Sequence, residues 1–249
     1  MMINSPIPRI GGKRLLRTKI CDSFPSGERF NRYIEVFGGG GWVLFSKEKQ
    51  ADFEIYNDAD GNLVNLMRCI KYHCSELQRE IDGFYNSREI FYDVSQQLNC
   101  RGFTDIQRAA RYFIKMRLSF GADGRSFGCS KKPLYRSKDY LSVISDRLKN
   151  VLIENKDFED LIKVYDRPSS FFYLDPPYHT TEKYYDIEFT EDDHKRLASQ
   201  LSQIQGKFLL SYNDDTFIRE LYKDYTIVSL SRNNNMSSGS FKELLIRNY

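Results

Sequence analysis

The stretch Tyr33-Ile34-Glu35-Val36-Phe37-Gly38-Gly39-Gly40-Gly41 joins an apolar run to four consecutive glycines. The run at residues 33–37 predicts a buried strand, and the segment from Trp42 to Lys47 predicts a helix that begins directly after the glycines. Residues 53–56 predict a second strand, which ends at Asn57-Asp58. A strand, a glycine loop, a helix and a strand that ends in an acid form the opening of an α/β unit of the nucleotide-binding type.

The strand and helix patterns in the rest of the sequence continue the α/β alternation, except in one mostly helical segment. Further strands are predicted at residues 151–153, 171–174, 208–212, 225–230 and 244–246, and helices at 62–70, 76–85, 105–118, 191–204 and 216–222. The last two strands leave no room for a helix between them, so they predict an antiparallel hairpin at one edge of the sheet. We therefore expect a discontinuous α/β domain, residues 1–60 and 151–249, interrupted by a mostly helical insertion, residues 61–150.

Charge is distributed unevenly along the 249 residues. The net charge is +3, yet residues 101–150 hold twelve Lys and Arg against four Asp and Glu, interleaved with Tyr, Phe, Gly and Ser. A basic block in an otherwise acidic chain is typical of a segment that binds a polyanion, although most charge runs are solvated helix faces. The interleaved aromatic and small residues favour nucleic acid as the partner.

Cysteine usage, histidine usage and hydropathy exclude several classes. The five cysteines form no CxxC pair and three histidines are present, so the sequence predicts reduced thiols and no metal site. No apolar run approaches the length of a membrane span, and the first residues lack the apolar stretch of a signal peptide. We therefore expect a cytoplasmic protein that makes no membrane contact.

The predicted strand at 171–174 ends in Asp175-Pro176-Pro177-Tyr178. Proline has no backbone N–H and a fixed φ, so the chain after the acid can neither continue the strand nor start a helix. The turn offers a carboxylate beside a flat aromatic face, which together can bind the amino group of an unstacked nucleobase and stack on its ring. A rigid turn in which Asp175 caps a nearby group is the structural alternative.

Asp58 lies twenty residues after Gly38, at the end of the second predicted strand. An acid at this interval reaches the ribose hydroxyls in dinucleotide folds, and the glycines allow a cofactor to approach the backbone at a helix N-terminus. The two features together favour a cofactor that contains a nucleoside. A nicotinamide oxidoreductase is one alternative, but it does not explain Asp175-Pro176-Pro177-Tyr178.

Several short motifs follow one another along nearly the whole chain. They are Gly11-Gly12-Lys13, residues 35–41, residues 57–60, Asn155-Lys156-Asp157-Phe158, residues 175–178 and the C-terminal residues 242–249. In this order the chain resembles the DNA adenine-N6 methyltransferases of the Dam family. The resemblance implies a Rossmann-like class I methyltransferase fold with a mixed sheet. It also implies S-adenosylmethionine as cofactor and a flipped-out adenine in double-stranded DNA as the methyl acceptor.

The resemblance implies roles for individual residues in cofactor binding. Gly39 and Gly41 would line the methionine part, Asp58 would bind the ribose, and Asp157 and Phe158 would contact the adenine of the cofactor. Arg9 stands where the family commonly has an aromatic residue, and its guanidinium plane can stack in that residue's place. The implied cofactor-binding residues are Arg9, Gly12, Lys13, Phe37, Gly39, Gly41, Asp58, Asp157, Phe158 and Asp175.

The implied catalytic residues are Asp175, Pro176, Pro177 and Tyr178. The Asp175 carboxylate and the Pro176 carbonyl would accept hydrogen bonds from the adenine amine, while Tyr178 would stack on the flipped base. Residues 119–130 resemble the family's recognition hairpin, in which Arg125 is the candidate for a bidentate contact to guanine. The implied DNA-binding residues, including those expected to contact phosphates, are Arg117, Ser119, Arg125, Lys131, Lys132, Arg136 and Lys138.

Other functions remain open on the sequence alone. A methyltransferase of RNA adenine or of protein glutamine is one class, and a non-catalytic DNA-binding protein on the same fold is another. Asp rather than Asn at position 175, together with the basic insertion, favours DNA adenine. A monomer in solution is expected, a cognate restriction nuclease is left open as a partner, and GATC is the default expectation for the recognised site.

Overall fold

The computed structural model describes residues 2–26, 30–129, 134–180, 189–233 and 240–249. It divides into two compact units. The helical unit comprises Met1–Arg17, Gly39–Glu48 and Asp60–Asn155, and the sheet unit comprises Thr18–Gly38, Lys49–Ala59 and Lys156–Tyr249. Residues 1–17 and 39–48 thus group with the helices, whereas the sequence-based division places them with the sheet. The role of residues 61–150 as a target-recognition insertion stays a prediction.

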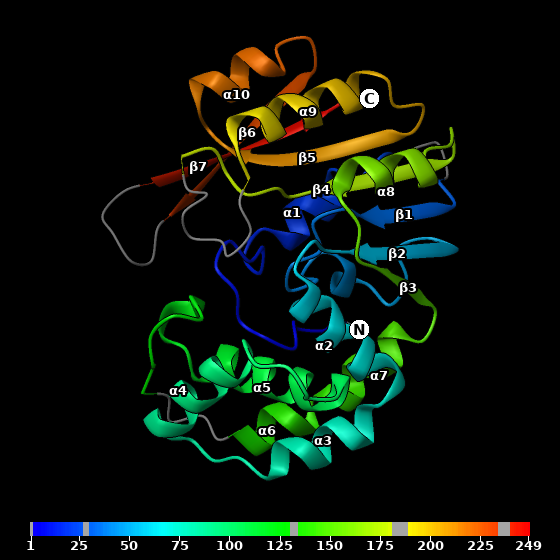
Figure 1. Cartoon of the computed structure of the whole chain (residues 1–249). Coiled ribbons are helices and arrows are strands. Elements are labelled where there is room, and N and C mark those ends of the chain that lie inside the picture. The colour runs from blue at the N-terminus through cyan, green and yellow to red at the C-terminus, as the bar shows by residue number, and fades with distance from the viewer. Residues whose placement is uncertain (1, 27–29, 130–133, 181–188, 234–239) are drawn as a thin grey trace. The chain divides into compact units, whose positions relative to one another are not determined.

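The sheet is mixed, with seven strands in the order β3-β2-β1-β4-β5-β7-β6. The pairs β1–β2, β1–β4 and β4–β5 are parallel, whereas β7 is antiparallel to both β5 and β6 (Figure 1). The strands are β1 (Arg32–Glu35), β2 (Phe53–Asn57), β3 (Val151–Glu154), β4 (Ser170–Leu174), β5 (Lys207–Asn213), β6 (Thr226–Asn233) and β7 (Ser240–Arg247). The predicted α/β fold with an antiparallel C-terminal hairpin is confirmed.

Strand β4 is the middle strand of the seven-stranded sheet, and all five of its residues are buried. A parallel strand covered on both faces reads as a continuous apolar run, which is the pattern of Phe171-Phe172-Tyr173-Leu174. On one face, Phe172 and Leu174 pack with residues of α8 (Phe158–Tyr165), α9 (Glu191–Ser202) and α10 (Thr216–Leu221). On the other face, the rings of Phe24 and Phe30 lie 4.6 and 4.9 Å from Phe171. Burial on both faces places Asp175, the next residue, at a rigid strand end.

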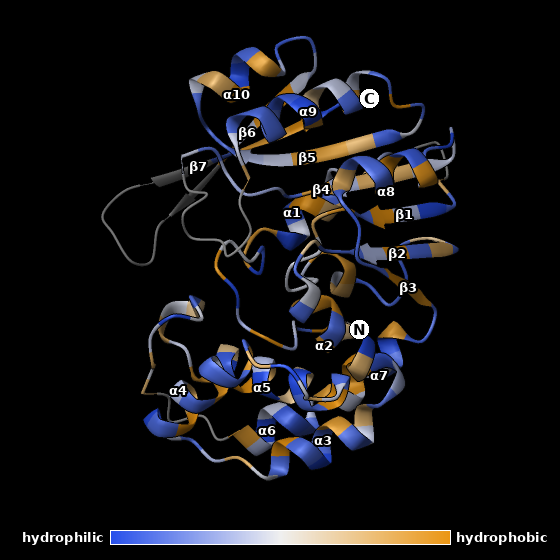
Figure 2. Ribbon diagram, in the orientation of Figure 1, coloured by the Kyte–Doolittle hydropathy of each residue, from blue (hydrophilic) through white to orange (hydrophobic). Residues whose placement is uncertain are grey.

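The helical unit is built around α5 (Asp105–Leu118), which packs against α2, α3 and α4. Thr104 and Gln107 form a capping box that starts α5 where the sequence predicts it. Hydrophilic and hydrophobic bands along α3 and α5 in Figure 2 follow from this packing. The remaining elements are α1 (Arg17–Asp22), α2 (Gly61–Tyr72), α3 (Cys74–Asp82), α4 (Arg88–Gln97), α6 (Leu134–Asp139) and α7 (Leu141–Leu148). No helix in the described ranges is long and apolar enough to cross a membrane.

One predicted helix is wrong. Residues 42–47 form only the 3₁₀ turn Leu44–Ser46, and the chain is extended again at Lys47, where φ is −129° and ψ is 159°. The Ser46 hydroxyl donates to the Val43 carbonyl at 2.7 Å and satisfies an oxygen that the next helical turn would otherwise use. The segment after the glycines is therefore a loop with one tight turn.

Candidate active site

The residue after β4, Asp175, is half-buried at the carboxyl end of the sheet's central strand. Ser211, on the neighbouring strand β5, donates its hydroxyl to Asp175 Oδ1 at 3.3 Å. The same hydroxyl lies 2.9 Å from the Tyr173 hydroxyl. Parallel strands bring their carboxyl ends to one edge of the sheet, where ligands of open α/β sheets bind. The Asp175 carboxylate therefore stands on a rigid support at the edge where a ligand is expected.

Tyr178 closes this turn and is 7% exposed. Its hydroxyl donates to Glu243 Oε1 of β7 at 2.8 Å, and its ring lies 5.9 Å from that of Tyr212. Burial, with the nearby charges of Asp175 and Glu243, raises the pKa of Tyr178 well above its ordinary value, so the phenol remains a donor. Stacking on a base requires the face of this ring to become more accessible when DNA binds.

The glycine loop contains positions of different character. A Cβ atom at Gly38 would overlap the ring of Tyr56, and one at Gly41, where φ is +69°, would lie 2.6 Å from the ring of Phe45. Both glycines are thus explained by close packing. At Gly39, φ is +50° and nothing lies within 4 Å of the position that a Cβ would take. Open space over the backbone at Gly39 is the feature that a cofactor approaching this loop needs.

Asn57, the last residue of β2, forms hydrogen bonds with the residues that follow the neighbouring strands β1 and β3. Its Nδ2 donates to the carbonyls of Val36 and Lys156 at 2.8 and 3.1 Å, and its Oδ1 accepts the Lys156 N–H at 2.8 Å. The Asn57 carbonyl accepts the N–H of Gly38 at 2.6 Å. The neighbouring Asp58 is 8% exposed. The sequence analysis assigns no role to Asn57. Its position at the end of a predicted strand, beside an acid, is the signal that could have indicated one.

Asp157 and Phe158 begin α8. Asp157 caps the helix by accepting a backbone N–H at 2.9 Å, and it pairs with Arg196 at 3.1 Å. The guanidinium of Arg196 lies 4.8 Å from the centre of the Phe158 ring. That ring is 5.8 Å from both Phe37 and Phe189, which lie 5.8 Å from each other. We call Phe37, Phe158 and Phe189 the aromatic cluster; Phe189 was missed because no motif surrounds it.

Arg9, predicted to contact the cofactor, makes a compact polar cluster in the helical unit. Its Nη1 donates to Asp60 Oδ2 at 3.0 Å and to the Tyr112 hydroxyl at 2.9 Å. Tyr112 in turn donates to Asp60 Oδ2 at 2.8 Å, and Asp60 caps α2. Arg9 and Asp60 are 16% and 12% exposed at their side chains. The guanidinium of Arg9 therefore stabilises the start of α2 in addition to any contact with a ligand.

Lys13 and Gly12 lie in the same unit. Lys13 is 5% exposed, and its Nζ donates to the Gly11 carbonyl at 3.2 Å. A Cβ at Gly12 would lie 2.8 Å from Trp42 Nε1. A lysine is rarely buried without a partner, and Lys13 has one in the Gly11 carbonyl, so its role at the cofactor stays a prediction.

The predicted recognition hairpin forms between residues 118 and 128. Ser119 and Phe127 make an antiparallel bridge, and the N–H of Gly128 donates to the Leu118 carbonyl at 2.7 Å. Asp123 Oδ1 accepts the N–H groups of Arg125 and Ser126 at 2.8 and 3.2 Å and so rigidifies the tip. Arg125 is exposed beside this turn. The hairpin thus presents Arg125 to solvent on a defined backbone.

The remaining predicted DNA contacts differ in their surroundings. Arg117 donates to the Pro6 carbonyl, and burial lowers its pKa to about 10. Lys138 forms a salt bridge with Asp82. Arg136 is exposed, with its guanidinium 6.0 Å from the Tyr135 ring. Lys131 and Lys132 lie outside the described residues. Arg125 and Arg136 are thus the more accessible members of the described set.

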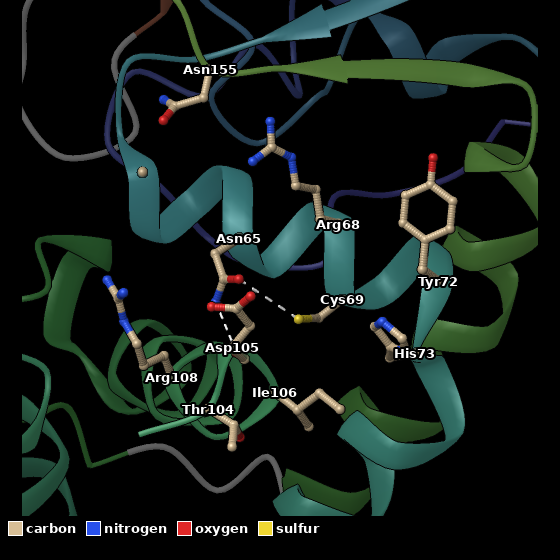
Figure 3. Close-up of a pocket in the computed structure, with 11 residues that line it drawn as sticks. Asn65, Arg68, Cys69, Tyr72, His73, Thr104, Asp105, Ile106, Arg108 and Asn155 are labelled. Atoms are coloured by element: carbon tan, nitrogen blue, oxygen red, sulfur yellow. Dashed lines mark hydrogen bonds between the residues drawn. The ribbon is translucent and has the colours of Figure 1, made fainter. Parts of the chain in front are cut away.

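A cavity of about 600 Å³ lies in the helical unit, between α2, the start of α5 and the end of β3 (Figure 3). Asn65 donates to the Asp105 carbonyl at 2.8 Å and lies 3.8 Å from the Cys69 sulfur. Arg68 and Arg108, which also line it, donate to protein oxygens at 3.4 and 2.8 Å. Burial raises the pKa of the Cys69 thiol to about 11, which makes it a poor nucleophile. The residues that line this cavity include none of the predicted site residues.

Comparisons with known proteins agree with the sequence motifs. The family model of the D12 class N6 adenine-specific DNA methyltransferases matches residues 10–236. Type II methyltransferase M1.LlaDCHI of Lactococcus lactis subsp. cremoris is 29% identical over 96% of this chain and 93% of that protein. Type II methyltransferase M.MjaIII of Methanocaldococcus jannaschii is 28% identical over 96% of both chains.

Among solved structures, the chain is similar to the rRNA methyltransferase aviRa from Streptomyces viridochromogenes. The TM-score is 0.38 and the identity 12%, over 93% of this chain and 83% of that one, a level that carries no conclusion of its own. The family model spans the glycine loop, the recognition hairpin and the Asp175-Pro176-Pro177-Tyr178 turn. The chain belongs to the D12 class N6 adenine-specific DNA methyltransferases, and it is an enzyme that methylates adenine in DNA at specific sites.

Proposed function

We propose that S-adenosylmethionine is the methyl donor and that the acceptor is the N6 amine of an adenine flipped out of duplex DNA. Individual residues of the predicted cofactor set have surroundings that suit such a cofactor. The open space over Gly39 admits a ligand to the backbone, Asp58 supplies a carboxylate for ribose hydroxyls, and the aromatic cluster supplies rings for an adenine. When bound, S-adenosylmethionine supplies an electrophilic methyl group on a sulfonium.

The placement of Asp175 at the end of β4 is the observation that carries the proposal for the target base. The lone pair of the adenine amine is delocalised into the ring, which makes the nitrogen a weak nucleophile. Hydrogen bonds from the amine to the Asp175 carboxylate and the Pro176 carbonyl would localise that lone pair. Ser211 supports the carboxylate at 3.3 Å, so its orientation is set before the base arrives. An ordinary carboxylate is too weak a base to deprotonate a neutral amine, so we assign Asp175 no general-base role.

Tyr178 would stack on the flipped base. Stacking on an aromatic side chain is worth about 1–3 kcal/mol per base, which offsets part of the cost of unstacking the adenine from the duplex. Pro177 keeps the turn stiff between the carboxylate and the ring. The turn then binds the base by its edge and by its face.

The remaining cofactor contacts follow the family pattern. Gly39 and Gly41 would line the methionine part, Phe37 would pack beside it, and Asp157 with Phe158 would contact the adenine moiety. Gly12 and Lys13 would lie near the cofactor and the target pocket, with Arg9 supporting the same segment. Lys13 is 5% exposed and bonded to the Gly11 carbonyl, so its side chain is held within the Gly11-Gly12-Lys13 motif that the family pattern places near the cofactor.

Arg125, at the tip of the hairpin, would recognise the edge of a guanine, because a guanidinium can donate hydrogen bonds to O6 and N7 at the same time. Lys131, Lys132, Arg136 and Lys138 would contact phosphates and contribute affinity rather than specificity. The predicted DNA-binding set also includes Arg117 and Ser119. The names of the relatives as Type II methyltransferases support a restriction–modification role with a cognate nuclease. We expect a monomer in solution, and GATC is the first sequence to test.

The test is transfer of labelled methyl from S-adenosylmethionine to unmethylated plasmid DNA, followed by mapping of N6-methyladenine by sequencing. We expect modified adenines within one short repeated sequence. Asp175→Ala should abolish transfer. Cofactor binding, measured by calorimetry, should stay near that of the wild type, because the other nine predicted cofactor-binding residues are unchanged. Asp192→Ala is the matched control, because Asp192 is 89% exposed on α9 and should tolerate the change without effect.

Two outcomes would contradict the proposal. Transfer that persists in Asp175→Ala would remove Asp175 from the reaction. Plasmid methylation that occurs with another methyl source and without binding of S-adenosylmethionine would overturn the assignment of the donor.

A further inference from the structure

A buried glutamate on the last strand binds the tyrosine of the Asp175-Pro176-Pro177-Tyr178 turn. The Tyr178 hydroxyl donates to Glu243 Oε1 at 2.8 Å, and the two residues are 7% and 2% exposed. They lie 65 residues apart in the chain. A hydrogen bond to a carboxylate is charge-assisted, and it is stronger in a buried site than in water. The bond therefore restrains the far end of the Tyr178 side chain.

The contact belongs to a larger arrangement on the β5–β7 ribbon. Asn213 of β5 stands directly opposite Glu243 of β7 in the strand register. Its Nδ2 donates to the carbonyl of His179 at 3.2 Å, while Ser211, two residues earlier, donates to Asp175. Residues i and i+2 of a strand share a face, and so do directly opposite residues of two paired strands. One face of the ribbon thus contacts two residues of the turn, Asp175 and Tyr178, and His179, which directly follows it.

We propose that Glu243 is a positioning residue for methyl transfer, which sets the orientation of the Tyr178 ring toward the flipped adenine. This inference rests on the stacking role proposed for Tyr178. The hydroxyl oxygen of a tyrosine lies on the Cβ–Cγ axis, so a bond at the hydroxyl fixes the direction of that axis and hence where the ring lies. Because the pKa of Tyr178 is raised by burial and by the charges of Asp175 and Glu243, the hydroxyl stays a donor throughout the neutral range. Glu243 is thereby predicted to affect base flipping and not the cofactor.

The test uses the intact chain and two duplexes that contain the mapped site. The first keeps the target adenine and gives kcat/KM, and the second has 2-aminopurine in its place, whose fluorescence rises when the base unstacks. We expect Glu243→Ala to lower kcat/KM for DNA by about tenfold to a hundredfold, the range for one lost charge-assisted hydrogen bond. The fluorescence rise should fall in parallel, while KM for S-adenosylmethionine stays unchanged. Glu243→Gln keeps an oxygen acceptor and should recover much of both signals.

Tyr178→Phe and the double variant Tyr178→Phe/Glu243→Ala separate positioning from a general structural role. If Glu243 acts through the tyrosine hydroxyl, the double variant is no worse than the poorer single variant. Should Glu243→Ala not fold, Tyr178→Phe removes the same bond from the other side and keeps the ring. Glu54→Ala is the matched control: Glu54 is a glutamate of β2 that is 4% exposed and accepts the Gln50 N–H, and its loss should leave base flipping unchanged.

The outcomes distinguish the inference from the proposed function. If Glu243→Ala matches the wild type in fluorescence and in kcat/KM while Tyr178→Phe is impaired, the positioning role is overturned and the stacking role stands. If the losses in kcat/KM of the two single variants multiply in the double variant, Glu243 acts independently of the Tyr178 hydroxyl. If the fluorescence rise is larger in Glu243→Ala than in the wild type, the bond opposes base flipping. Either result overturns the inference. Wild-type methylation by Tyr178→Ala would instead overturn the stacking role itself.

Discussion

The side chain of Asn57 binds the backbone of Lys156 at both its N–H and its carbonyl, at 2.8 and 3.1 Å. It thereby connects the end of β2 to the segment that leads into α8. Asn248 makes a similar two-sided contact elsewhere in the sheet unit: it accepts the Phe208 N–H at 2.9 Å and donates to the Gly206 carbonyl at 3.0 Å. The two asparagines make the same kinds of hydrogen bond to the backbone, but only Asn57 lies next to predicted cofactor-binding residues.

Asn57→Ala should weaken both the fold and cofactor binding. Asn57 is 1% exposed, so its removal leaves backbone groups of Lys156 without their partner, at a cost of about 1–3 kcal/mol for each buried group. Chemical denaturation measures the free energy of unfolding, and calorimetry the dissociation constant of S-adenosylmethionine. Asn248→Ala should destabilise the protein without changing that constant. Equal effects of the two variants on cofactor affinity would contradict a local role for Asn57.

Gly39→Ala and Gly41→Ala should affect cofactor binding and stability to different extents. A Cβ at Gly39 meets nothing within 4 Å, so that variant should fold with a backbone penalty of about 1–2 kcal/mol for its positive φ. A Cβ at Gly41 would press on the Phe45 ring as well, which adds a steric cost. We expect Gly39→Ala to lose cofactor affinity with a modest fall in Tm, and Gly41→Ala to show the larger fall in Tm. Full cofactor affinity in Gly39→Ala would exclude ligand from the space over that residue.

The Arg9–Asp60 pair should make stability depend on pH in the acid range. Burial favours the neutral form of Asp60, but the Arg9 charge and the hydrogen bonds from Tyr112 and Leu63 outweigh it and lower the pKa of Asp60 below 3.8. The contribution is thus fully present above the unfolded-state pKa and is lost as the pH falls through the lower folded-state value. Asp60→Asn keeps a side-chain oxygen that can cap α2.

Urea unfolding between pH 7 and pH 3 measures this effect. The wild type should be more stable than Asp60→Asn at neutral pH, with the difference narrowing once the pH drops below about 4. Asp52→Asn is the control, because the Lys49–Asp52 pair is exposed and should contribute little at any pH. A difference between wild type and Asp60→Asn that does not change with pH would refute the assignment.

Arg125 and Arg136 should separate DNA specificity from DNA affinity. Loss of a bidentate base contact in Arg125→Ala should cost about 1–3 kcal/mol at the cognate site and relax the preference at one base position. Arg136→Ala should weaken binding equally at all sequences and lower the slope of log K against log salt by about one. Lys138→Ala should have less effect, since Lys138 is already paired with Asp82. Binding titrations at several salt concentrations distinguish these patterns.

The parts of the fold that depend on local pattern could be predicted from the sequence. Helix α5 spans residues 105–118 as expected, because a capping box at Thr104 and Gln107 precedes a strongly periodic segment. Strand β4 ends before Asp175 because two prolines follow. The hairpin of β6 and β7 followed from the short connection between two strand signals. In each case the decisive residues lie within the element or close to it in the sequence.

Other parts of the fold are not specified by apolar periodicity or by turn residues, and they could not be predicted in this way. The helix expected at 42–47 shortened to a 3₁₀ turn because of where the Ser46 hydroxyl donates. Helix α8 was missed, since Asp157-Phe158 was interpreted as a ligand-binding motif although it also caps and begins a helix. The Tyr178–Glu243 bond requires the register of β5 and β7, which no local pattern specifies.

The way the chain alternates between its two units bears on how such enzymes can change the sequence they recognise. The helices from Asp60 onward contact the short segments 1–17 and 39–48: Arg117 donates to the Pro6 carbonyl, and Arg147 donates to the carbonyls of Leu44 and Lys47 at 3.0 Å. In a chimaera that exchanges residues 61–150 alone, Arg117 and Arg147 would be replaced by the residues of another protein. The carbonyls of Pro6, Leu44 and Lys47 could then lose their hydrogen-bond donors. The segment predicted to recognise the target is therefore not structurally independent of residues 1–17 and 39–48. If Arg125 contacts the base as proposed, substitutions around the hairpin tip are the less disruptive route to a new target sequence.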